Sequence, residues 1–216
     1  LSMYFIGVAF CAFANMATSA ASRFFSFFGI EYNVDFGETP KGFFGFLLCL
    51  LSTVITPALI EEFAFRGIVL GSLKKYGEGF AVLVSSILFG LMHGNFEQIP
   101  FAFLVGLVLG LITVKTDSIL IACAVHGTNN LVSVIFDFIP SDISQAAQNI
   151  MYLIFLLICL TLGILALALS EKSNEMFKLK KDSCESKLKE RFKWFFTSPA
   201  IIIFIVICIF ESLAYF

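Results

Sequence analysis

The sequence contains little charge. Only 14% of its 216 residues are Asp, Glu, Lys or Arg, whereas 59% are hydrophobic and 28 are phenylalanine. A soluble domain carries about 25% charged residues, so this composition excludes an ordinary soluble surface. The net charge of −2 also excludes a basic nucleic-acid-binding protein. The expected surrounding of the chain is the lipid bilayer.

Several motifs of common catalytic and nucleotide sites are absent. The sequence has no HExxH, GxSxG, GxGxxG or Walker loop. Its six cysteines are scattered without a CxxC pair, so we interpret them as small buried hydrophobic residues. What remains is a small set of carboxylates, an asparagine and the only two histidines, all placed inside apolar sequence.

Long hydrophobic runs are abundant. Because a membrane span needs roughly 20 apolar residues, we predict an all-α polytopic bundle of about seven transmembrane segments with an intramembrane catalytic cavity. The whole chain, 1–216, is predicted to form one integral-membrane domain. The runs are 3–28, 43–73, 80–93, 99–114, 119–136, 149–169 and 199–215.

The run 43–73 is too long for one straight perpendicular span. At 1.5 Å per residue it would measure about 46 Å, against a hydrocarbon core of about 30 Å. Pro57 is expected to kink or break this helix just before Glu61. A broken helix at membrane depth must line protein or a water-filled cavity, so the break and the charge indicate the same place.

Loop charge predicts the topology. The loops 29–41, 94–98 and 137–142 are acidic, whereas 74–79 is basic and 115–117 is neutral. The charge-rich segment 171–197 holds eight basic and five acidic residues up to Lys193. We interpret this segment as a solvated cytoplasmic helical hairpin or linker. By the positive-inside rule, the less acidic loops and the start of the first segment are cytoplasmic.

Three separate segments carry polar residues to a similar depth. Measured along each helix from the inferred cytoplasmic face, Glu61 lies at about 18 Å, His93 at about 20 Å and Asn130 at about 17 Å. His126 is one helical turn shallower. Ionisable residues inside a membrane are costly and usually functional, so we expect these side chains to form one site.

The residue types suit acid–base hydrolysis. A desolvated Glu61 could act as a general base on water, while His93 could orient that water, share its proton or help to bind a metal. His126 and Asn130 share a helix face and could donate to an oxyanion. The alternatives are an interhelical polar pair for His126 and Asn130, and an ion pair or ion pathway for Glu61.

Glu62 and Arg66 are predicted to support the site structurally. They stand four residues apart in the favourable acid-first order for an ion pair on one helix. This leaves Glu61 for chemistry, although the swapped assignment, with Glu62 as the base, stays open.

These residues form three motifs in order on separate hydrophobic segments: Glu61 to Arg66 reads EExxxR, Phe89 to His93 reads FxxxH, and His126 to Asn130 reads HxxxN. The motif core, 43–136, resembles the CAAX prenyl endopeptidase and bacteriocin-processing (CPBP, or Abi) family of intramembrane proteases. The resemblance implies a cavity open to the cytoplasm, a water activated by Glu61 and His93, and an oxyanion hole formed by His126 and Asn130. The chain is shorter than a full domain of that family, which suggests a shortened N-terminus.

The resemblance further implies a substrate class and a location. The substrate would be a small hydrophobic or prenylated peptide, such as a CAAX tail, a pheromone precursor or a bacteriocin-type peptide. We expect no obligatory cofactor; the alternative is zinc bound by Glu61, His93 and His126. Composition favours a bacterial cell membrane, with the endoplasmic reticulum membrane as the eukaryotic equivalent. The rival functions are a non-catalytic scaffold or immunity protein and an ion-coupled transporter.

Overall fold

The computed structural model describes residues 1–28, 40–96, 98–170, 178–180 and 186–213. Within these ranges the regular elements are helices, and no strand occurs. In chain order the elements are α1 (Ser2–Phe27), α2 (Gly42–Cys49), η1 (Leu50–Ile55), α3 (Thr56–Glu62), η2 (Phe63–Leu70), α4 (Gly71–Leu73), η3 (Lys74–Tyr76), α5 (Glu78–Met92), α6 (Gln98–Thr116), α7 (Ile119–Asp137), α8 (Gln145–Ala168), α10 (Leu188–Phe196) and α11 (Pro199–Leu213).

The predicted all-α membrane fold is confirmed, but the number of spans differs. In the described part of the chain, five helices are long and apolar enough to cross a membrane, or six if a bent pair counts as one span. That pair is α10 and α11, which meet at an angle of 69°. Helix α5 has 15 residues and is shorter than a usual span. All seven predicted runs are therefore helical, while the count of seven spans is not reached.

The predicted break of the helix at Pro57 does not occur. Residues Gly42–Tyr76 form one continuous helix of 35 residues, which we call the long helix. Two π-helical stretches, η1 and η2, flank α3, in which Pro57 is the second residue. Proline supplies no backbone N–H, and the wider π winding shifts the hydrogen-bond register around the missing donor. The proline thus changes the winding of the helix without interrupting it.

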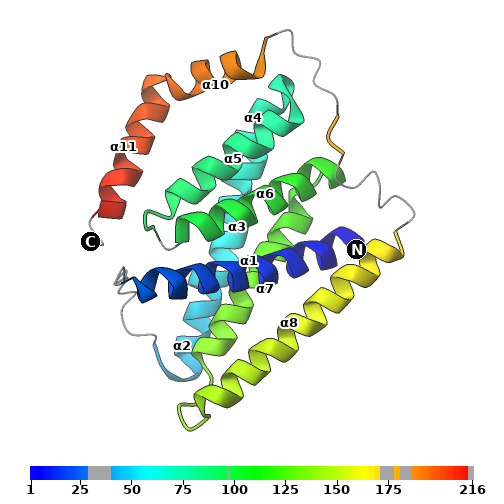
Figure 1. Cartoon of the computed structure of the whole chain (residues 1–216), viewed down its shortest axis with the longest axis vertical. Coiled ribbons are helices and arrows are strands. Elements are labelled where there is room, and N and C mark those ends of the chain that lie inside the picture. The colour runs from blue at the N-terminus through cyan, green and yellow to red at the C-terminus, as the bar shows by residue number, and fades with distance from the viewer. Residues whose placement is uncertain (29–39, 97, 171–177, 181–185, 214–216) are drawn as a thin grey trace.

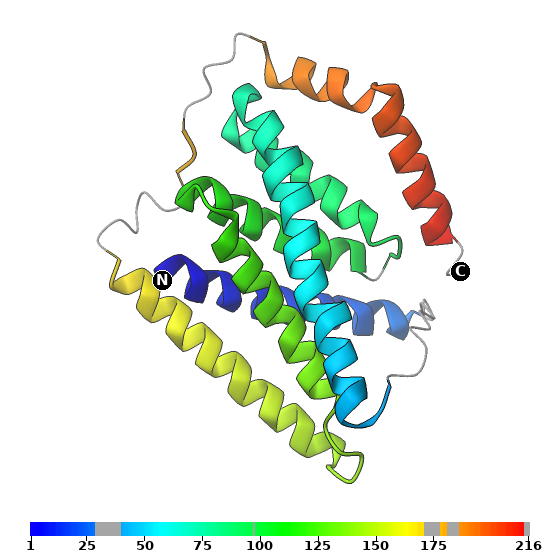
Figure 2. The same ribbon diagram turned by 180° about the vertical axis from the view of Figure 1, so that it is seen from behind.

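The helices are layered around α7. Figures 1 and 2 show α1 running across the long helix, with α7 between them. Helix α7 contacts α1 on one side and both η1 and α3 on the other. Helices α5 and α6 form an extensively packed pair beside η2, and α8 covers α1. This arrangement places the three predicted motif segments, on the long helix, α5 and α7, next to one another.

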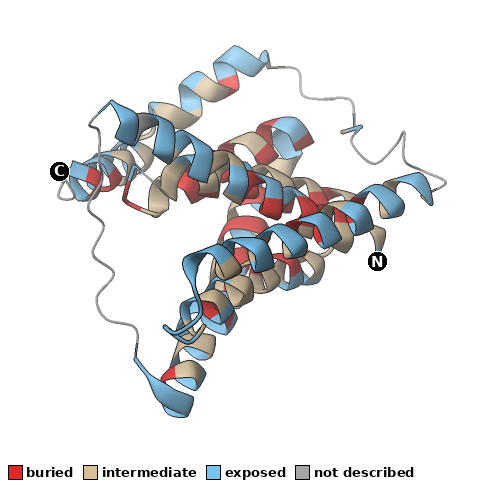
Figure 3. Ribbon diagram, turned by 60° about the horizontal axis from the view of Figure 1, so that its bottom comes forward, coloured by how far each residue is buried: buried red, intermediate tan, exposed pale blue. Residues whose placement is uncertain are grey.

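The outer faces of the bundle are apolar and exposed. Figure 3 shows buried residues where helices meet and exposed residues on the outward faces. Phe44, Ile164 and Phe210 keep 80%, 66% and 76% of their surface exposed. Such faces suit lipid, as expected for an integral membrane protein. Of the five described cysteines, all free, three are buried and two are half-buried, which agrees with the expected hydrophobic role.

Three loops meet at one end of the molecule. Lys74 pairs with Asp117 at 2.9 Å, and this hydrogen bond lowers the pKa of Asp117. Lys115 donates to the carbonyl of Lys178, and Arg191 donates to the carbonyl of Tyr76. The loops that we predict to be cytoplasmic therefore lie together. The predictions for 29–39, 97, 171–177 and 181–185 concern residues outside the described ranges.

Candidate active site

A buried ion pair anchors the site on the long helix. Arg66 Nη1 lies 2.7 Å from Glu62 Oε1, and both side chains are fully buried. Arg66 Nη2 also donates to the carbonyl of Gly106 on α6, at 3.3 Å. The contact predicted from the spacing of these two residues is therefore formed. Since the guanidinium has both a carboxylate and a carbonyl as partners, it fixes α6 against the long helix.

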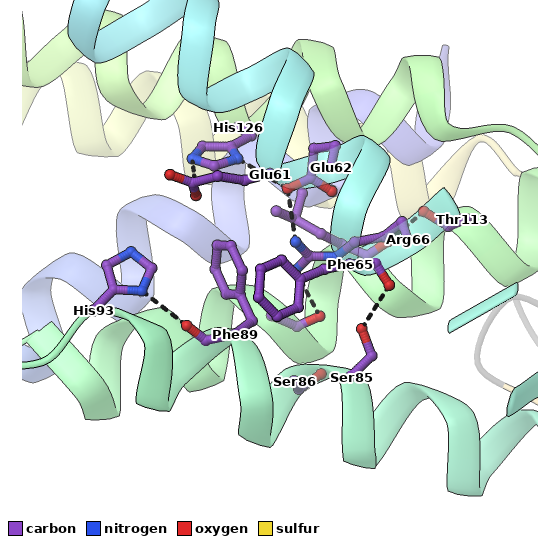
Figure 4. A network of polar contacts seen from close by, with 12 residues as sticks. Glu61, Glu62, Phe65, Arg66, Ser85, Ser86, Phe89, His93, Thr113 and His126 are labelled. Atoms are coloured by element: carbon purple, nitrogen blue, oxygen red, sulfur yellow. Dashed lines mark hydrogen bonds and ion pairs between the residues drawn. The ribbon is translucent and has the colours of Figure 1, made fainter. Parts of the chain in front are cut away.

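Phe89 is the aromatic centre of the cluster. Its ring stacks under the Arg66 guanidinium, with 4.2 Å between the guanidinium carbon and the ring centroid. The same ring makes edge contacts with His93 and His126, at centroid distances of 5.0 and 5.9 Å. Figure 4 shows this ring between the two imidazoles and the Glu62–Arg66 pair. Phe89 thus positions three of the predicted polar residues, which is a packing role for the first residue of FxxxH.

His126 stands between the two glutamates. Its Nδ1 lies 2.9 Å from Glu62 Oε1, and its Nε2 lies 4.0 Å from Glu61 Oε2. An ionised carboxylate can only accept, so Nδ1 carries a proton toward Glu62. This bond fixes the ring orientation and directs Nε2 toward Glu61.

Glu61 and Glu62 are adjacent in sequence but differ in environment. Successive helical residues point about 100° apart, and the Glu61 side chain is 25% exposed whereas that of Glu62 is fully buried. Among the described residues, Glu61 Oε2 is buried and has no hydrogen-bond partner. Glu62 Oε2 also lacks a partner among these residues, but Glu62 Oε1 is bonded to both Arg66 and His126 and the whole side chain is buried. Glu61 is therefore the carboxylate that a water molecule can reach.

The end of α5 positions His93. The backbone N–H of His93 bonds to Gly90, which leaves the Phe89 carbonyl without its usual i+4 donor. His93 Nδ1 donates to that carbonyl at 2.8 Å. The helix then stops at Gly94, whose φ of +63° is the left-handed conformation common at helix ends. With Nδ1 protonated, Nε2 of the neutral ring is an acceptor, and Figure 4 shows it on the side of Glu61.

Asn130 lies outside this cluster, one turn or about 6 Å further along α7. Its Nδ2 donates to the carbonyl of Thr53 in η1, at 2.9 Å. Its Oδ1 accepts from Asn129 Nδ2 at 3.2 Å. The structure therefore brings Glu61, Glu62, Arg66, His93 and His126 into one cluster and holds Asn130 beside it.

The zinc set considered from sequence is not assembled here. No three His, Cys, Asp or Glu side chains in the described ranges group closely enough to hold a metal ion. Glu61 and His126 are neighbours, but His93 is turned toward the Phe89 carbonyl through Nδ1.

Sequence reasoning missed the groups that hold the motif residues in place. The contributions of Phe89 and of the Gly106 carbonyl depend on packing between helices distant in sequence. A glycine in an apolar run, such as Gly106, can indicate close helix packing, and a Cβ there would indeed lie 3.1 Å from Ser86 Cα. Asn129 occupies a variable position of HxxxN, so the motif assigns it no role.

Comparison with known proteins finds sequence relatives for the region that contains these residues. Residues 43–132 match the model of the family described as type II CAAX prenyl endopeptidase Rce1-like. The membrane-embedded CAAX protease MroQ of Staphylococcus aureus (strain USA300) is 32% identical over 114 residues, which are 48% of this chain and 46% of MroQ. YdiL of Bacillus subtilis (strain 168) is 28% identical over 95 residues, 44% of this chain and 38% of YdiL. No solved structure matches the chain.

The chain therefore spans less than half the length of these two curated relatives. The matched region nevertheless contains all three motifs, from Glu61 to Asn130. On that region, the chain is similar to the Rce1-like family of type II CAAX prenyl endopeptidases.

Proposed function

We propose that this chain is an intramembrane endopeptidase in which Glu61 activates a water molecule. The observation that carries the proposal is the Glu61 carboxylate. Its Oε2 has no hydrogen-bond partner among the described residues and its side chain is 25% exposed, whereas the neighbouring Glu62 is fully buried, with Oε1 bonded to Arg66 and His126. A carboxylate free to accept a proton beside an acceptor imidazole is the arrangement that a general base needs.

The proposed reaction adds water across one peptide bond. Glu61 takes one proton from the water, and His93 Nε2 accepts a hydrogen bond from its other hydrogen. The resulting hydroxide attacks the carbonyl carbon, and the tetrahedral intermediate carries the negative charge on its oxygen. Collapse breaks the C–N bond, and the proton on Glu61 passes to the leaving amine. A positioned general base of this kind contributes about 10²–10⁴ in rate.

His126 and Asn130 would stabilise the oxyanion. The bond from His126 Nδ1 to Glu62 supports a donor role for Nε2, because the carboxylate stabilises a ring protonated on both nitrogens. Asn130 would donate from Nδ2. Loss of one oxyanion donor lowers kcat by about 10²–10³.

The substrate we propose is a small hydrophobic or prenylated peptide presented from the bilayer. Two observations support a lipid-side substrate: the apolar exposed faces of the long helix, and the CAAX protease named among the relatives. We further propose a bacterial cell membrane as the location and a cavity open to the cytoplasm, where the less acidic loops gather.

The test is a cleavage assay with purified protein in detergent. Wild type, Glu61→Gln and Glu78→Gln would be incubated with a farnesylated CAAX peptide and with a hydrophobic pheromone precursor, with and without a chelator. We expect cleavage by wild type and Glu78→Gln only, because Glu78 bonds the backbone of Lys180 at the other end of α5. Unchanged cleavage in the chelator lane is expected for a metal-independent base.

Two outcomes would overturn the proposal. Full activity of Glu61→Gln would remove Glu61 from the mechanism. Absence of products from every peptide, together with ion-coupled uptake by the same protein in liposomes, would favour a carrier.

A further inference from the structure

Three asparagines form a chain of hydrogen bonds that ends at the backbone carbonyl of Thr53. That carbonyl lacks the donor that it would have in a regular α-helix. In an α-helix the carbonyl of Thr53 would accept from residue 57, but Pro57 has no N–H. Asn130 Nδ2 donates to this carbonyl at 2.9 Å. The proline thus provides the acceptor to which α7 is bound.

The Thr53 carbonyl determines the donor-to-acceptor direction of every hydrogen bond in this chain of asparagines. Because a carbonyl oxygen can only accept, Asn130 must present Nδ2 to Thr53 and Oδ1 to its other neighbour. Asn129 Nδ2 donates to that Oδ1 at 3.2 Å. Asn129 Oδ1 accepts in turn from Asn15 Nδ2 of α1, at 2.9 Å. The chain Asn15–Asn129–Asn130–Thr53 therefore links α1, α7 and the long helix in one direction.

These hydrogen bonds determine which group of the Asn130 carboxamide remains available to a ligand. Each carboxamide carries two N–H donors and one carbonyl acceptor. One N–H of Asn130 bonds Thr53, and its carbonyl is held by Asn129. The second N–H is the group that remains. A carboxamide turned over by 180° would present its oxygen in place of that donor and would repel an oxyanion.

We propose that Asn129 and Asn15 are positioning residues, which lock the Asn130 carboxamide in the donor orientation needed for the oxyanion. The proposal rests on the proposed peptidase function. Asn129 holds the Asn130 oxygen directly, and Asn15 holds Asn129 from α1. The pre-orientation matters in the transition state, because the donor must not reorganise when charge develops.

A purely structural role is the alternative, since polar side chains also join helices in membranes. The molecule contains a matched control for it. Tyr4 of α1 bonds Thr128 of α7 at 2.8 Å, so it joins the same two helices without contacting the chain. Tyr4→Phe removes that bond and leaves the Asn130 carboxamide held.

The experiment is a double-mutant cycle on kcat and KM for a cleaved peptide. We expect Asn129→Ala to lower kcat about tenfold, the scale of one lost hydrogen bond, with KM nearly unchanged. Asn130→Ala should lower kcat by about 10². In the Asn130→Ala background, Asn129→Ala should have no further effect, since it acts through Asn130. Asn15→Ala should show a smaller fall of the same kind, and Tyr4→Phe should retain wild-type kcat.

Equal falls in both backgrounds, or an equal fall for Tyr4→Phe, would overturn the proposal in favour of helix packing. A second readout does not depend on cleavage. Selective ¹⁵N-asparagine labelling reports the Asn130 carboxamide, identified by its loss in Asn130→Ala. Its signal should shift and exchange faster with solvent in Asn129→Ala but not in Tyr4→Phe. An unchanged signal in Asn129→Ala would contradict the proposed positioning role, whether or not wild type cleaves a peptide. Failure of wild type to cleave any peptide would instead count against the peptidase function.

Discussion

At the scale of single residues, the site separates two adjacent glutamates by their partners. Glu62 is fully buried with Oε1 bonded to Arg66 and His126, whereas Glu61 is 25% exposed and lies 4.0 Å from His126 Nε2. The partners of Glu62 compensate its buried charge. The environment of Glu61 leaves its carboxylate available as a base. The two residues should therefore differ in what their replacement affects.

We expect Glu62→Gln to destabilise the fold and Glu61→Gln to leave it nearly unchanged. Loss of the Glu62 charge strands a buried guanidinium, which costs about 3 kcal/mol. Glu61 has only the 4.0 Å contact with His126 Nε2 to lose. Unfolding of both variants by SDS in mixed micelles, followed by circular dichroism, measures the difference. Equal destabilisation of both would contradict the division of roles, and Glu78→Gln serves as the control.

The sequence allowed part of this site to be predicted. The Glu62–Arg66 contact follows from a spacing of four residues on one helix, and His126 with Asn130 follows from the same rule. The bonds of His126 to Glu62 and of Arg66 to Gly106 join residues 64 and 40 positions apart. Such contacts depend on how helices pack, which local periodicity does not encode. The packing of Phe89 against Arg66, His93 and His126 was not predicted for that reason.

At the scale of elements, small residues determine how closely helices approach. Gly106 of α6 lies against Ser86 of α5, and its carbonyl accepts from Arg66. The hydrophobic runs of the sequence predicted the long helix, α5 and α6, but not the π-helical winding of the long helix. Pro57 suggested a break, whereas π turns on both sides kept the long helix continuous. A missing N–H can be accommodated by a change of register, and neighbouring side chains decide whether it is.

We expect Gly106→Ala to destabilise the protein and Gly67→Ala to stabilise it slightly or leave it unchanged. A Cβ at Gly106 would lie 3.1 Å from both Cα and Cβ of Ser86, and such overpacking costs about 1–3 kcal/mol. A Cβ at Gly67 meets only the Phe63 ring at 3.5 Å, so the helix propensity of alanine gains up to about 1 kcal/mol. Thermal unfolding in detergent compares them, and a stable Gly106→Ala protein would contradict tight α5–α6 packing.

At the scale of the whole molecule, two independent observations concern the same end. The loops with the less acidic composition are those that the positive-inside rule assigns to the cytoplasm. The structure joins these loops through Lys74–Asp117, Lys115–Lys178 and Arg191–Tyr76. Alternating loop charge and the spatial grouping of these loops therefore agree, although the count of seven spans is not confirmed. This grouping requires only that the three loops lie on the same side of the membrane.

The sidedness can be measured with single cysteines introduced into a variant in which the six native cysteines are replaced. We expect Asp142→Cys to react with a membrane-impermeant maleimide in intact cells, because it lies in the acidic loop after α7. Lys75→Cys and Lys189→Cys should react only after permeabilisation, since both lie at the end where the three loops meet. All three exposed positions should react in permeabilised cells, which controls for accessibility. Reaction of Lys75→Cys and Lys189→Cys on opposite sides would contradict the fold itself. Reaction of both in intact cells would be consistent with the fold but would show the opposite orientation in the membrane. The proposed cavity would then open away from the cytoplasm.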